Sequence, residues 1–409
     1  MSDSTAPGPL AGIRIVDATN VVAGPYATQI LADLGADVIK IESAEGDPMR
    51  GAGPNPAGDM APLYVSLNRN KRSVALDLAR DGAKDALRRL LRTADVFITN
   101  VRPQGIARLG FDYEAVRAVK PDIVYVHVVG FLAGGPYAGR PAYDDLIQAA
   151  SGMADLWPKT ERAGPPRFMP TLVCDKAVGL HAVYGLLAAL LHRERTGKGQ
   201  FVEVPMLEVS VSFNLAEHMY GHAYEPPVAE WGYTRILTTN RRPFETKDSY
   251  IAILPYSEAQ WAAFFEAAGR PEIWDRWRGR SFAERTAAMD ELYGALAALA
   301  RERTTDEWMR VLDAGGVPCM RVNRLEDLES DPHLAAVGMF QEREHPSPGV
   351  GRYRTLRHPV RFSAAPTSVR LDPPRLGADG RDLLRDVGLD DAAIDALVAD
   401  GSLAVPRTD

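Results

Sequence analysis

The sequence has few cysteines and no excess of positive charge. Cys174 and Cys319 are the two cysteines among 409 residues, which is too few for a disulfide framework. Lysine and arginine total 47 against 54 aspartates and glutamates, so the formal net charge is -7. This balance excludes attraction of nucleic acid by bulk charge. An anionic ligand must therefore be held by a local site.

Long apolar runs and targeting segments are also lacking. The longest apolar run, residues 182–191, is too short to span a bilayer. The first residues are polar and show no basic region followed by an apolar stretch, so we expect no signal or transit peptide. Hydrophobic residues make up 46% and charged residues 25%, as in ordinary globular proteins. We therefore expect a cytoplasmic protein with no membrane and no nucleic-acid partner.

The usual nucleotide and metal motifs are absent. Residues 22–26 read Val-Ala-Gly-Pro-Tyr where a dinucleotide-binding chain would place Gly-x-Gly-x-x-Gly. The chain has no Walker loop, no G-x-S-x-G elbow and no kinase signature. Of eight scattered histidines, His218 and His222 have i, i+4 spacing, but Glu217 precedes the pair, so H-E-x-x-H is absent. We expect no metal site.

Strands and helices alternate in the first third of the chain. Apolar strands are predicted at residues 12–18, 37–41, 73–78, 94–99 and 123–129, with helices at 27–34 and 82–92. This alternation is typical of a parallel sheet covered on both faces, the α/β class. A loop rich in glycine and proline, residues 130–141, follows the last of these strands. Such loops at the carboxyl ends of parallel strands are where doubly wound sheets bind ligands.

The remainder of the chain predicts a second, smaller unit. Helices at 142–154 and 175–192 and a strand at 201–205 extend the first unit. A smaller α/β unit follows, with a predicted strand at 249–254 and helices at 258–268, 283–300 and 306–313. The proline-rich tail is expected to run extended across other elements before a last helix at 390–398.

Four segments, taken together, carry a family resemblance. They are residues 9–17 (PLAGIRIVD) with Ala23-Gly24-Pro25, residues 34–42 (LGADVIKIE), residues 70–73 (NKRS), and residues 175–200 from Asp175 to TGKGQ. With them the chain resembles the family III coenzyme A transferases of the CaiB/BaiF type, which also contain the α-methylacyl-CoA racemases. Residues 331–334 (DPHL), 374–377 (PRLG) and 388–389 look like the family's carboxyl region. The match runs nearly end to end.

The resemblance implies a fold and an assembly. It implies a Rossmann-like large domain with a parallel sheet, built from residues 1–225 and from the C-terminal segment 323–409, and a small domain at residues 226–322. It also implies a homodimer of interlocked rings. Coenzyme A thioesters and small carboxylic acids are the implied substrates, without a tightly bound cofactor.

Asp175 is the candidate nucleophile. From the residues alone it is a carboxylate that caps the apolar helix it opens. The resemblance implies instead that it attacks an acyl-CoA thioester, because an ionised oxygen forms a mixed anhydride that the released thiolate can reopen. Asp175 then becomes an aspartyl-CoA thioester, from which CoA moves to an acceptor acid. Backbone amides at the helix start are expected to stabilise the oxyanion.

Candidate CoA-binding residues precede and follow the predicted strands. Asn100 and Val101 come directly after the strand at 94–99, at the edge where a ligand sits. The resemblance implies CoA contacts for a wider set, namely Val21, Ala23, Leu76, Asn100, Val101 and Arg108. A basic clump of Arg69, Lys71 and Arg72 either meets CoA phosphates or is a charged loop before a strand.

Several residues depart from the family pattern. Ser43 stands where several members have an arginine for the nucleotide, and Val22 replaces a glutamine of the oxalate-using branch. Oxalate specificity is therefore poorly supported. Arg235, Arg241 and Arg242 either meet an acceptor carboxylate or are surface arginines.

Tyr143 bears on the type of reaction. The racemase branch has an acid/base histidine at this place, and tyrosine is a poor base at neutral pH. Tyr143 either donates a hydrogen bond near the anhydride or is a buried structural tyrosine. The sequence thus favours a CoA transferase with Asp175 and Tyr143 as its catalytic residues. An acyl-CoA racemase or epimerase, and a catalytically silent acyl-CoA binding protein, are the alternatives.

Overall fold

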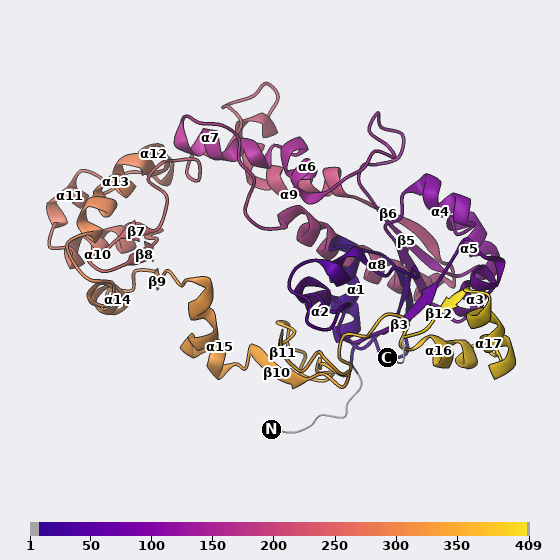
Figure 1. Ribbon diagram of the computed structural model, residues 1–409. Helices are drawn as coiled ribbons and strands as arrows, with labels where there is room; N and C mark the ends of the chain where they lie inside the picture. Colours follow the sequence, from indigo (N-terminus) through magenta and orange to yellow (C-terminus); the bar gives the residue numbers. More distant parts are fainter. Residues whose placement is uncertain (1–7, 407–409) are drawn as a thin grey trace. The chain divides into compact units, whose positions relative to one another are not determined.

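The computed structural model describes residues 8–406, which form two compact units (Figure 1). Within the described residues, the first unit contains residues 8–151, Met169–Phe213 and residues 332–406, and the second contains Gly152–Phe168 and Asn214–Asp331. The first and last of the described residues thus lie in one unit. The boundaries differ from the expected 225 and 322, and residues 152–168 belong with the second unit. Each unit is described by itself.

A seven-stranded sheet forms the centre of the first unit, in the order β12-β3-β2-β1-β4-β5-β6. All neighbouring strands are parallel except β12, which runs antiparallel to β3. Every residue of β4 and β5 is buried, as expected for parallel strands covered on both faces. The prediction of a mixed α/β fold with a large, mostly parallel sheet is confirmed. Its strands are β1 Arg14–Ala18, β2 Asp37–Glu42, β3 Lys71–Leu76, β4 Val96–Thr99, β5 Val124–Val129, β6 Gln200–Pro205 and β12 Leu403–Ala404.

Helices cover both faces of this sheet. Successive side chains of a strand point to opposite faces of the sheet. The side chains on one face, which include Val16, Ile39 and Phe97, pack with α3, α5, α16 and α17. Helices α1 and α8 pack against the strands as well, α1 on β2 and α8 on β5 and β6. The α-helices of the unit are α1 Ala23–Asp33, α2 Pro62–Leu67, α3 Asp81–Arg92, α4 Pro103–Leu109, α5 Tyr113–Val119, α6 Asp144–Ala150, α8 Val173–Thr196, α15 Pro332–Ala336, α16 Gly380–Asp386 and α17 Asp391–Ala399.

Helix α8 has 24 residues and, by length and composition alone, is long and apolar enough to cross a membrane. In this fold its buried residues pack on the sheet and on α1, while Leu180, Tyr184 and Leu191 are exposed. Gly179 permits the contact with α1, because a Cβ at this position would lie 2.9 Å from the carbonyl oxygen of Ala23 and 2.9 Å from Cδ1 of Tyr26. This close approach brings the second turn of α8 next to the start of α1.

The C-terminal tail returns across the first unit, as its prolines predict. The side-chain oxygen of Asn70 accepts the N–H groups of Arg370 and Leu371, at 2.5 Å and 2.9 Å. The Ser73 N–H donates to the carboxylate of Asp379 at 2.7 Å. The tail also contains an antiparallel hairpin that was not expected, β10 Phe340–Glu344 with β11 Arg352–Leu356. A 3₁₀ turn, η1 Pro48–Gly51, lies between β2 and α2.

The second unit is a small α/β unit with its own core. Its three-stranded antiparallel sheet has the order β7-β8-β9, and its core is rich in buried aromatic residues such as Trp261, Trp274 and Trp308. The strands are β7 Phe244–Glu245, β8 Tyr250–Ile253 and β9 Cys319–Arg321, and the α-helices are α7 Leu156–Glu161, α10 Glu258–Ala267, α11 Pro271–Asp275, α12 Phe282–Ala287, α13 Met289–Ala300 and α14 Thr305–Ala314. Three 3₁₀ helices, η2 Met153–Asp155, η3 Tyr220–Ala223 and η4 Leu325–Ser330, complete it, and α9 Met206–His218 runs from the first unit into the second.

Two expectations for the second unit are wrong. The single helix expected over residues 283–300 is two helices, because a capping box at Ser281 starts α12 separately and the helix ends at Ala288. Arg235 is buried rather than a surface arginine, and its guanidinium lies 4.3 Å from the ring centre of Tyr256. The two rings that its guanidinium approaches, those of Tyr256 and Phe282, are 58% and 43% exposed, so this cation–π contact lies beside the surface and not in the aromatic core. Arg241 and Arg242 are exposed.

Candidate active site

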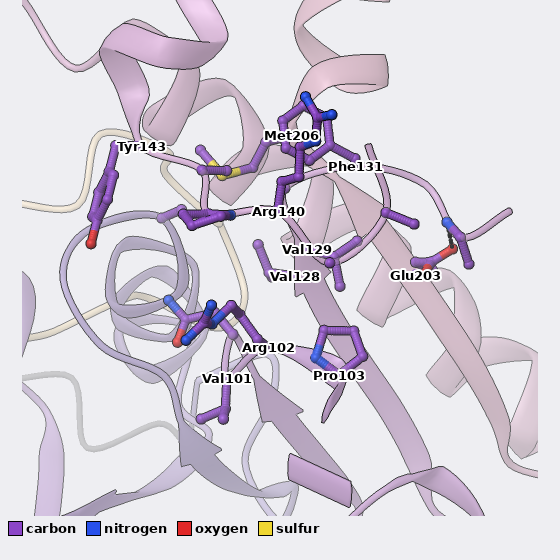
Figure 2. A pocket seen from close by; sticks show the side chains of 18 of the residues that line it. Val101, Arg102, Pro103, Val128, Val129, Phe131, Arg140, Tyr143, Glu203 and Met206 are labelled. Carbon is purple, nitrogen blue, oxygen red and sulfur yellow. Dashed lines mark hydrogen bonds between the residues drawn. The ribbon is translucent and has the colours of Figure 1, made fainter. Parts of the chain in front are cut away.

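A cavity of about 500 Å³ opens at the carboxyl edge of the seven-stranded sheet, within the first unit (Figure 2). The chain runs from β1 to β2 and β3 on one side and then returns to place β4 and β5 on the other. Ligands of open parallel sheets bind where the strand order reverses in this way. The cavity is lined by residues 20–23 after β1, residues 100–104 after β4, residues 128–131, 133–134 and 138–143 at and after the end of β5, and Asp175, Glu203 and Met206.

Asp175 lines this cavity from the first turn of α8. Helix α8 begins at Val173 and its N-cap is Leu172, which makes no side-chain cap. The capping role expected for Asp175 is therefore wrong, because the residue lies inside the first turn. It is only 8% exposed, and among the described residues no hydrogen bond or ion pair engages its carboxyl oxygens. Burial, and then the negative charge of Asp144, raises the pKa of Asp175 to about 7.

Two backbone N–H groups at the start of α8 already have hydrogen-bond acceptors. The Asp175 N–H donates to the Asp144 carboxylate at 2.9 Å, and the Val173 N–H donates to the carbonyl of Thr171 at 2.7 Å. The expectation that these amides stabilise an oxyanion is therefore wrong for these two groups. Asp144 itself was not singled out from the sequence, since its contact with Asp175 spans 31 positions.

Asn100 holds the loop after β1 against the end of β4. Its side-chain oxygen accepts the N–H of Asn20 at 3.0 Å, and its side-chain nitrogen donates to the carbonyl of Asn20 at 2.8 Å. Val21, the next residue, has a φ of 72°, a left-handed conformation that is unusual for a β-branched side chain. Val21 and Ala23 line the cavity together with Asn100 and Val101, so four of the predicted CoA-binding residues come together on one wall.

Buried charged side chains hold the backbone of this loop in place. The Val21 N–H donates to Asp47 at 3.2 Å, and Asp47 pairs with Lys40 at 2.9 Å. The ammonium group of Lys40 also donates to the carbonyl of Thr19 at 2.8 Å. Burial lowers the pKa of Lys40, but the charges of Asp17 and Asp47 outweigh it and leave that pKa raised. Lys40 is therefore charged and holds both ends of the loop.

Arg69, Lys71 and Arg72 do not form a basic surface at the cavity. Arg69 and Lys71 are buried, and they pair with Asp33 at 2.5 Å and with Asp17 at 3.2 Å. Burial lowers the pKa of Lys71 to about 8. Arg72 pairs with Asp37 at 2.7 Å and does not line the cavity. The three cations thus neutralise three separate carboxylates within the fold.

Two further cavities adjoin the first at Val101. One, of about 750 Å³, is lined by Arg102, Gln104 and Arg108, which are exposed. The other, of about 380 Å³, is lined by Leu76 and by Ser43. None of its lining residues is a lysine or an arginine. The arginine that the family pattern would place at Ser43 is therefore not replaced by another cation among these residues.

The glycine-rich loop after β5 closes the cavity on the remaining side. Tyr143 lies at one side of the cavity in Figure 2 and is 65% exposed, so the alternative of a buried structural tyrosine is wrong. Glu203 of β6 and Glu208 of α9 accept the N–H groups of Ala133 and Leu132, at 3.4 Å and 3.1 Å. These two carboxylates position the loop, and sequence reasoning did not identify them. Within residues 8–406, no group of three histidine, cysteine, aspartate or glutamate residues could hold a metal ion.

Comparison with known proteins gives the same family along almost the whole chain. The succinyl-CoA:glutarate CoA-transferase of Mus musculus is 32% identical over 412 aligned positions, which cover 100% of this chain and 93% of that protein. A probable fatty acyl-CoA transferase of Mycobacterium tuberculosis is 31% identical over 92% of this chain and 98% of its own length. The crystal structure of a CAIB/BAIF family protein from Brucella suis superposes with a TM-score of 0.78 at 30% identity, covering 93% of this chain and 100% of that one. Since residues 10–380 match the CoA-transferase family III, the chain belongs to that family and is a transferase.

Proposed function

We propose that this enzyme moves coenzyme A from an acyl-CoA thioester to a carboxylic acid, with Asp175 as the covalent nucleophile. The observation that carries the proposal is the place of Asp175. Its carboxyl group lines the cavity at the reversal point of the sheet, and no described side chain pairs with it. A buried carboxylate that is left without a cation is costly for folding. Such a group fits a reactive role better than a structural one.

The reaction proceeds by four displacements on acyl carbon atoms. The ionised Asp175 oxygen attacks the thioester carbonyl, the C–S bond breaks, and CoA leaves as its thiolate. The thiolate then attacks the aspartyl carbonyl of the mixed anhydride, which releases the donor acid and leaves an aspartyl-CoA thioester. The acceptor carboxylate attacks this thioester to give a second anhydride and free thiolate. Attack of the thiolate on the acceptor's carbonyl forms the new acyl-CoA and restores the Asp175 carboxylate.

The walls of the cavity suit the long, anionic CoA molecule. Asn100, Val21 and Ala23 are proposed to hold the pantetheine arm, since they form the wall beside Asp175. Arg102 and Arg108 are exposed in the adjoining cavity and form no ion pair among the described residues. Their free guanidinium groups are proposed to meet CoA phosphates, which arginine binds with bidentate hydrogen bonds. Tyr143 is proposed to donate a hydrogen bond to the reacting carbonyl.

The acceptor is proposed to be a small carboxylic acid. The mouse relative is named for succinyl-CoA and glutarate, and the mycobacterial relative for fatty acyl groups. We further propose that the enzyme acts as a homodimer. Helix α8 exposes apolar side chains at Leu180, Tyr184 and Leu191, which are 50%, 60% and 47% exposed in the single chain. These residues follow one face of the helix, and a second copy of the chain would cover it.

A single incubation tests the transfer and its nucleophile. The protein is mixed with succinyl-CoA and, in turn, glutarate or a fatty acid in deuterated water, and both the CoA esters and the intact protein are examined by mass spectrometry. We expect a new acyl-CoA and a CoA adduct on the wild-type protein, and neither with Asp175→Ala. The Asp145→Asn variant is the control, because Asp145 is exposed and does not line the cavity.

Two other outcomes would contradict the proposal. Deuterium at the α-carbon of the acyl group without acyl exchange would indicate racemisation instead of transfer. Binding of CoA esters with neither exchange nor adduct would indicate a silent binding protein.

A further inference from the structure

Two buried side chains of α6 hold the segment that leads into α8. The Oδ1 atom of Asp144 accepts the backbone N–H of Asp175 at 2.9 Å, and its Oδ2 atom accepts from the side chain of Gln148 at 2.7 Å. The oxygen of Gln148 accepts the N–H of Met169 at 2.7 Å, and its nitrogen lies 3.3 Å from the carbonyl oxygen of Met169 and 3.4 Å from that of Thr171. Asp144 and Gln148 are 4% and 0% exposed.

These contacts fix the direction of the first turn of α8. The first N–H groups of a helix have no partner within the helix, and here the carboxylate of Asp144 accepts one of them from a neighbouring helix. Leu172, the N-cap residue, supplies no side-chain cap. The local sequence of α8 supplies no side-chain cap, and Asp144 of α6 therefore caps this helix instead.

The charges of Asp144 and Asp175 are not compensated, which sets them apart from the other buried acids. The buried acids of the described chain are Asp17, Asp33, Glu42, Asp47, Asp144 and Asp175. The first four each form an ion pair with a buried lysine or arginine, at distances from 2.5 Å to 3.2 Å. No described lysine or arginine pairs with Asp144, whose partners are neutral donors. The two acids without a cation are thus the two that contact each other.

The other ionisable groups around the cavity do not relieve this repulsion. Those that line it are Arg102 after β4, Arg140 and Tyr143 on the loop after β5, and Glu203 on β6. The elements that pack on the start of α8, and α8 itself, also carry Tyr26, Asp145, Cys174 and Lys176, which do not line the cavity. The ammonium group of Lys176 turns to the hydroxyl of Thr171 at 2.6 Å. Burial and the charge of Asp144 are the two causes of the raised Asp175 pKa. A nearby like charge destabilises the ionised form of its neighbour.

We propose that Asp144 is a positioning residue for the reaction. It caps the turn that carries Asp175, and its negative charge favours the neutral, acylated forms of Asp175 over the free carboxylate. This inference rests on the proposed function. Formation of the mixed anhydride or of the aspartyl-CoA thioester removes the charge of Asp175 and with it the repulsion. Asp144 thereby favours the covalent intermediates, although it touches no reacting atom.

The Asp144→Asn variant tests the role of the charge. The asparagine oxygen keeps an acceptor for the Asp175 N–H while the charge is lost. With succinyl-CoA and no acceptor acid, we expect the fraction of protein that carries the CoA adduct to fall, with the adduct-to-free ratio reduced about tenfold, which corresponds to about one pKa unit of repulsion. Asp145→Asn removes the same charge from the exposed side of the same turn, and we expect the wild-type ratio.

A titration of Asp175 does not depend on catalytic activity. It therefore distinguishes a failure of this inference from a failure of the proposed function. Difference infrared spectra of protein labelled with ¹³C-carboxyl aspartate, with Asp175→Asn as the blank, report the protonation of Asp175 directly. We expect a midpoint near neutral pH in the wild type and in Asp145→Asn, and a midpoint about one unit lower in Asp144→Asn. If the wild type shows neither transfer nor adduct, the proposed function fails, while this titration still tests the influence of Asp144.

Two results would overturn the inference. One is an Asp144→Asn protein that melts like the wild type and has the same midpoint and adduct fraction. The other is a wild-type midpoint at the ordinary value of an aspartate, since the charge of Asp144 would then not reach Asp175. This second measurement needs no change at Asp144, so it can overturn the inference even if that variant does not fold.

Discussion

The side-chain amide of Asn100 and the backbone of Asn20 form a pair of hydrogen bonds of 3.0 Å and 2.8 Å that joins the loop after β1 to the end of β4. Both atoms of the amide are thereby engaged. Asn100, a predicted CoA-binding residue, therefore shapes the wall of the cavity through the loop that it holds. Its neighbours on that wall, Val21, Ala23 and Val101, have small apolar side chains.

Replacement of Asn100 should weaken substrate binding more than it slows chemistry. Asn100→Ala removes both bonds to Asn20 and frees a loop that already contains the left-handed Val21. We expect KM for the acyl-CoA to rise about tenfold with a smaller fall in kcat, because each lost hydrogen bond is worth about 1 kcal/mol. Steady-state kinetics measure both. An unchanged KM would mean that the loop keeps its shape without the bridge, and Asn323→Ala, at an exposed asparagine of the second unit, is the control.

The contact between α1 and α8 leaves no room for a methyl group at Gly179. A Cβ there would lie 2.9 Å from the backbone oxygen of Ala23, so Gly179→Ala must shift α1 and α8 apart at this contact. We expect a loss of about 1–3 kcal/mol in the free energy of unfolding, measured by urea denaturation, and a loss of transfer activity.

Gly185 offers a matched control on the same helix. A Cβ at Gly185 meets its nearest neighbour, Cγ1 of Val202, at the ordinary distance of 3.4 Å. Because alanine is the better helix former, Gly185→Ala should be neutral or stabilising by up to about 1 kcal/mol. Equal effects of the two substitutions would show that the contact with α1 is not the cause.

The rate of the first chemical step should increase as pH rises through neutrality. The pKa of Asp175 is raised to about 7 by burial and by Asp144, and only the ionised carboxylate attacks the thioester. We expect the rate of adduct formation from succinyl-CoA to be half-maximal at pH of about 7 and to fall about tenfold for each unit below it. Stopped reactions across a pH series, read by intact-protein mass spectrometry, give the profile. A flat profile down to about pH 5 would contradict a raised pKa.

The same raised pKa makes Asp175 a destabilising residue at neutral pH. The folded state binds a proton more tightly than the unfolded state, so stability due to Asp175 is fully present below the unfolded pKa and is lost as pH rises through about 7. We expect Asp175→Asn to be more stable than the wild type by up to a few kcal/mol above neutral pH. The difference should shrink toward about pH 4, where both side chains are neutral. Urea denaturation at several pH values measures this difference in stability. A difference that does not change with pH would show that the raised pKa of Asp175 is not its cause.

Loss of Lys71 should affect stability and leave CoA recognition intact. Its ammonium group is fully buried beside Asp17 at 3.2 Å, so Lys71→Met leaves a buried carboxylate without its cation. We expect a loss of about 3–5 kcal/mol, with much of it recovered when Asp17→Asn is added. KM for the acyl-CoA should stay near the wild-type value at a temperature where the variant is folded. A large change in KM without a change in stability would return Lys71 to the list of phosphate-binding candidates.

Local sequence patterns predicted the parallel strands well because those strands are buried on both faces. The runs at 12–18, 37–41, 94–99 and 123–129 each overlap an observed strand to within two residues at either end. The hairpin at β10 and β11 was missed, since its strands carry charged residues on an exposed edge and show no clear alternation. The family and its implied function came from the resemblance and not from periodicity, and the match over residues 10–380 confirms the family.

Contacts between distant residues were beyond prediction from one sequence. Asp144 and Gln148 stand in an ordinary helical segment, and only the packing of α6 on α8 brings them to Asp175. The cations Arg69 and Lys71 looked like a charged loop, because sequence alone does not show the buried acids that pair with them. A charged residue in this sequence therefore does not always mark the surface, since Arg69 and Lys71 lie in the interior.

The antiparallel strand β12, at Leu403 and Ala404, has a consequence for how the chain folds as it is made. The seven-stranded sheet is complete only when these residues reach β3, and they are synthesised after every residue of the second unit. The second unit needs no residue beyond Asp331 and has its own aromatic core. Domains fold largely as units during translation, so the middle of this chain is free to fold on the ribosome while the unit that carries Asp175 still waits for its last strand.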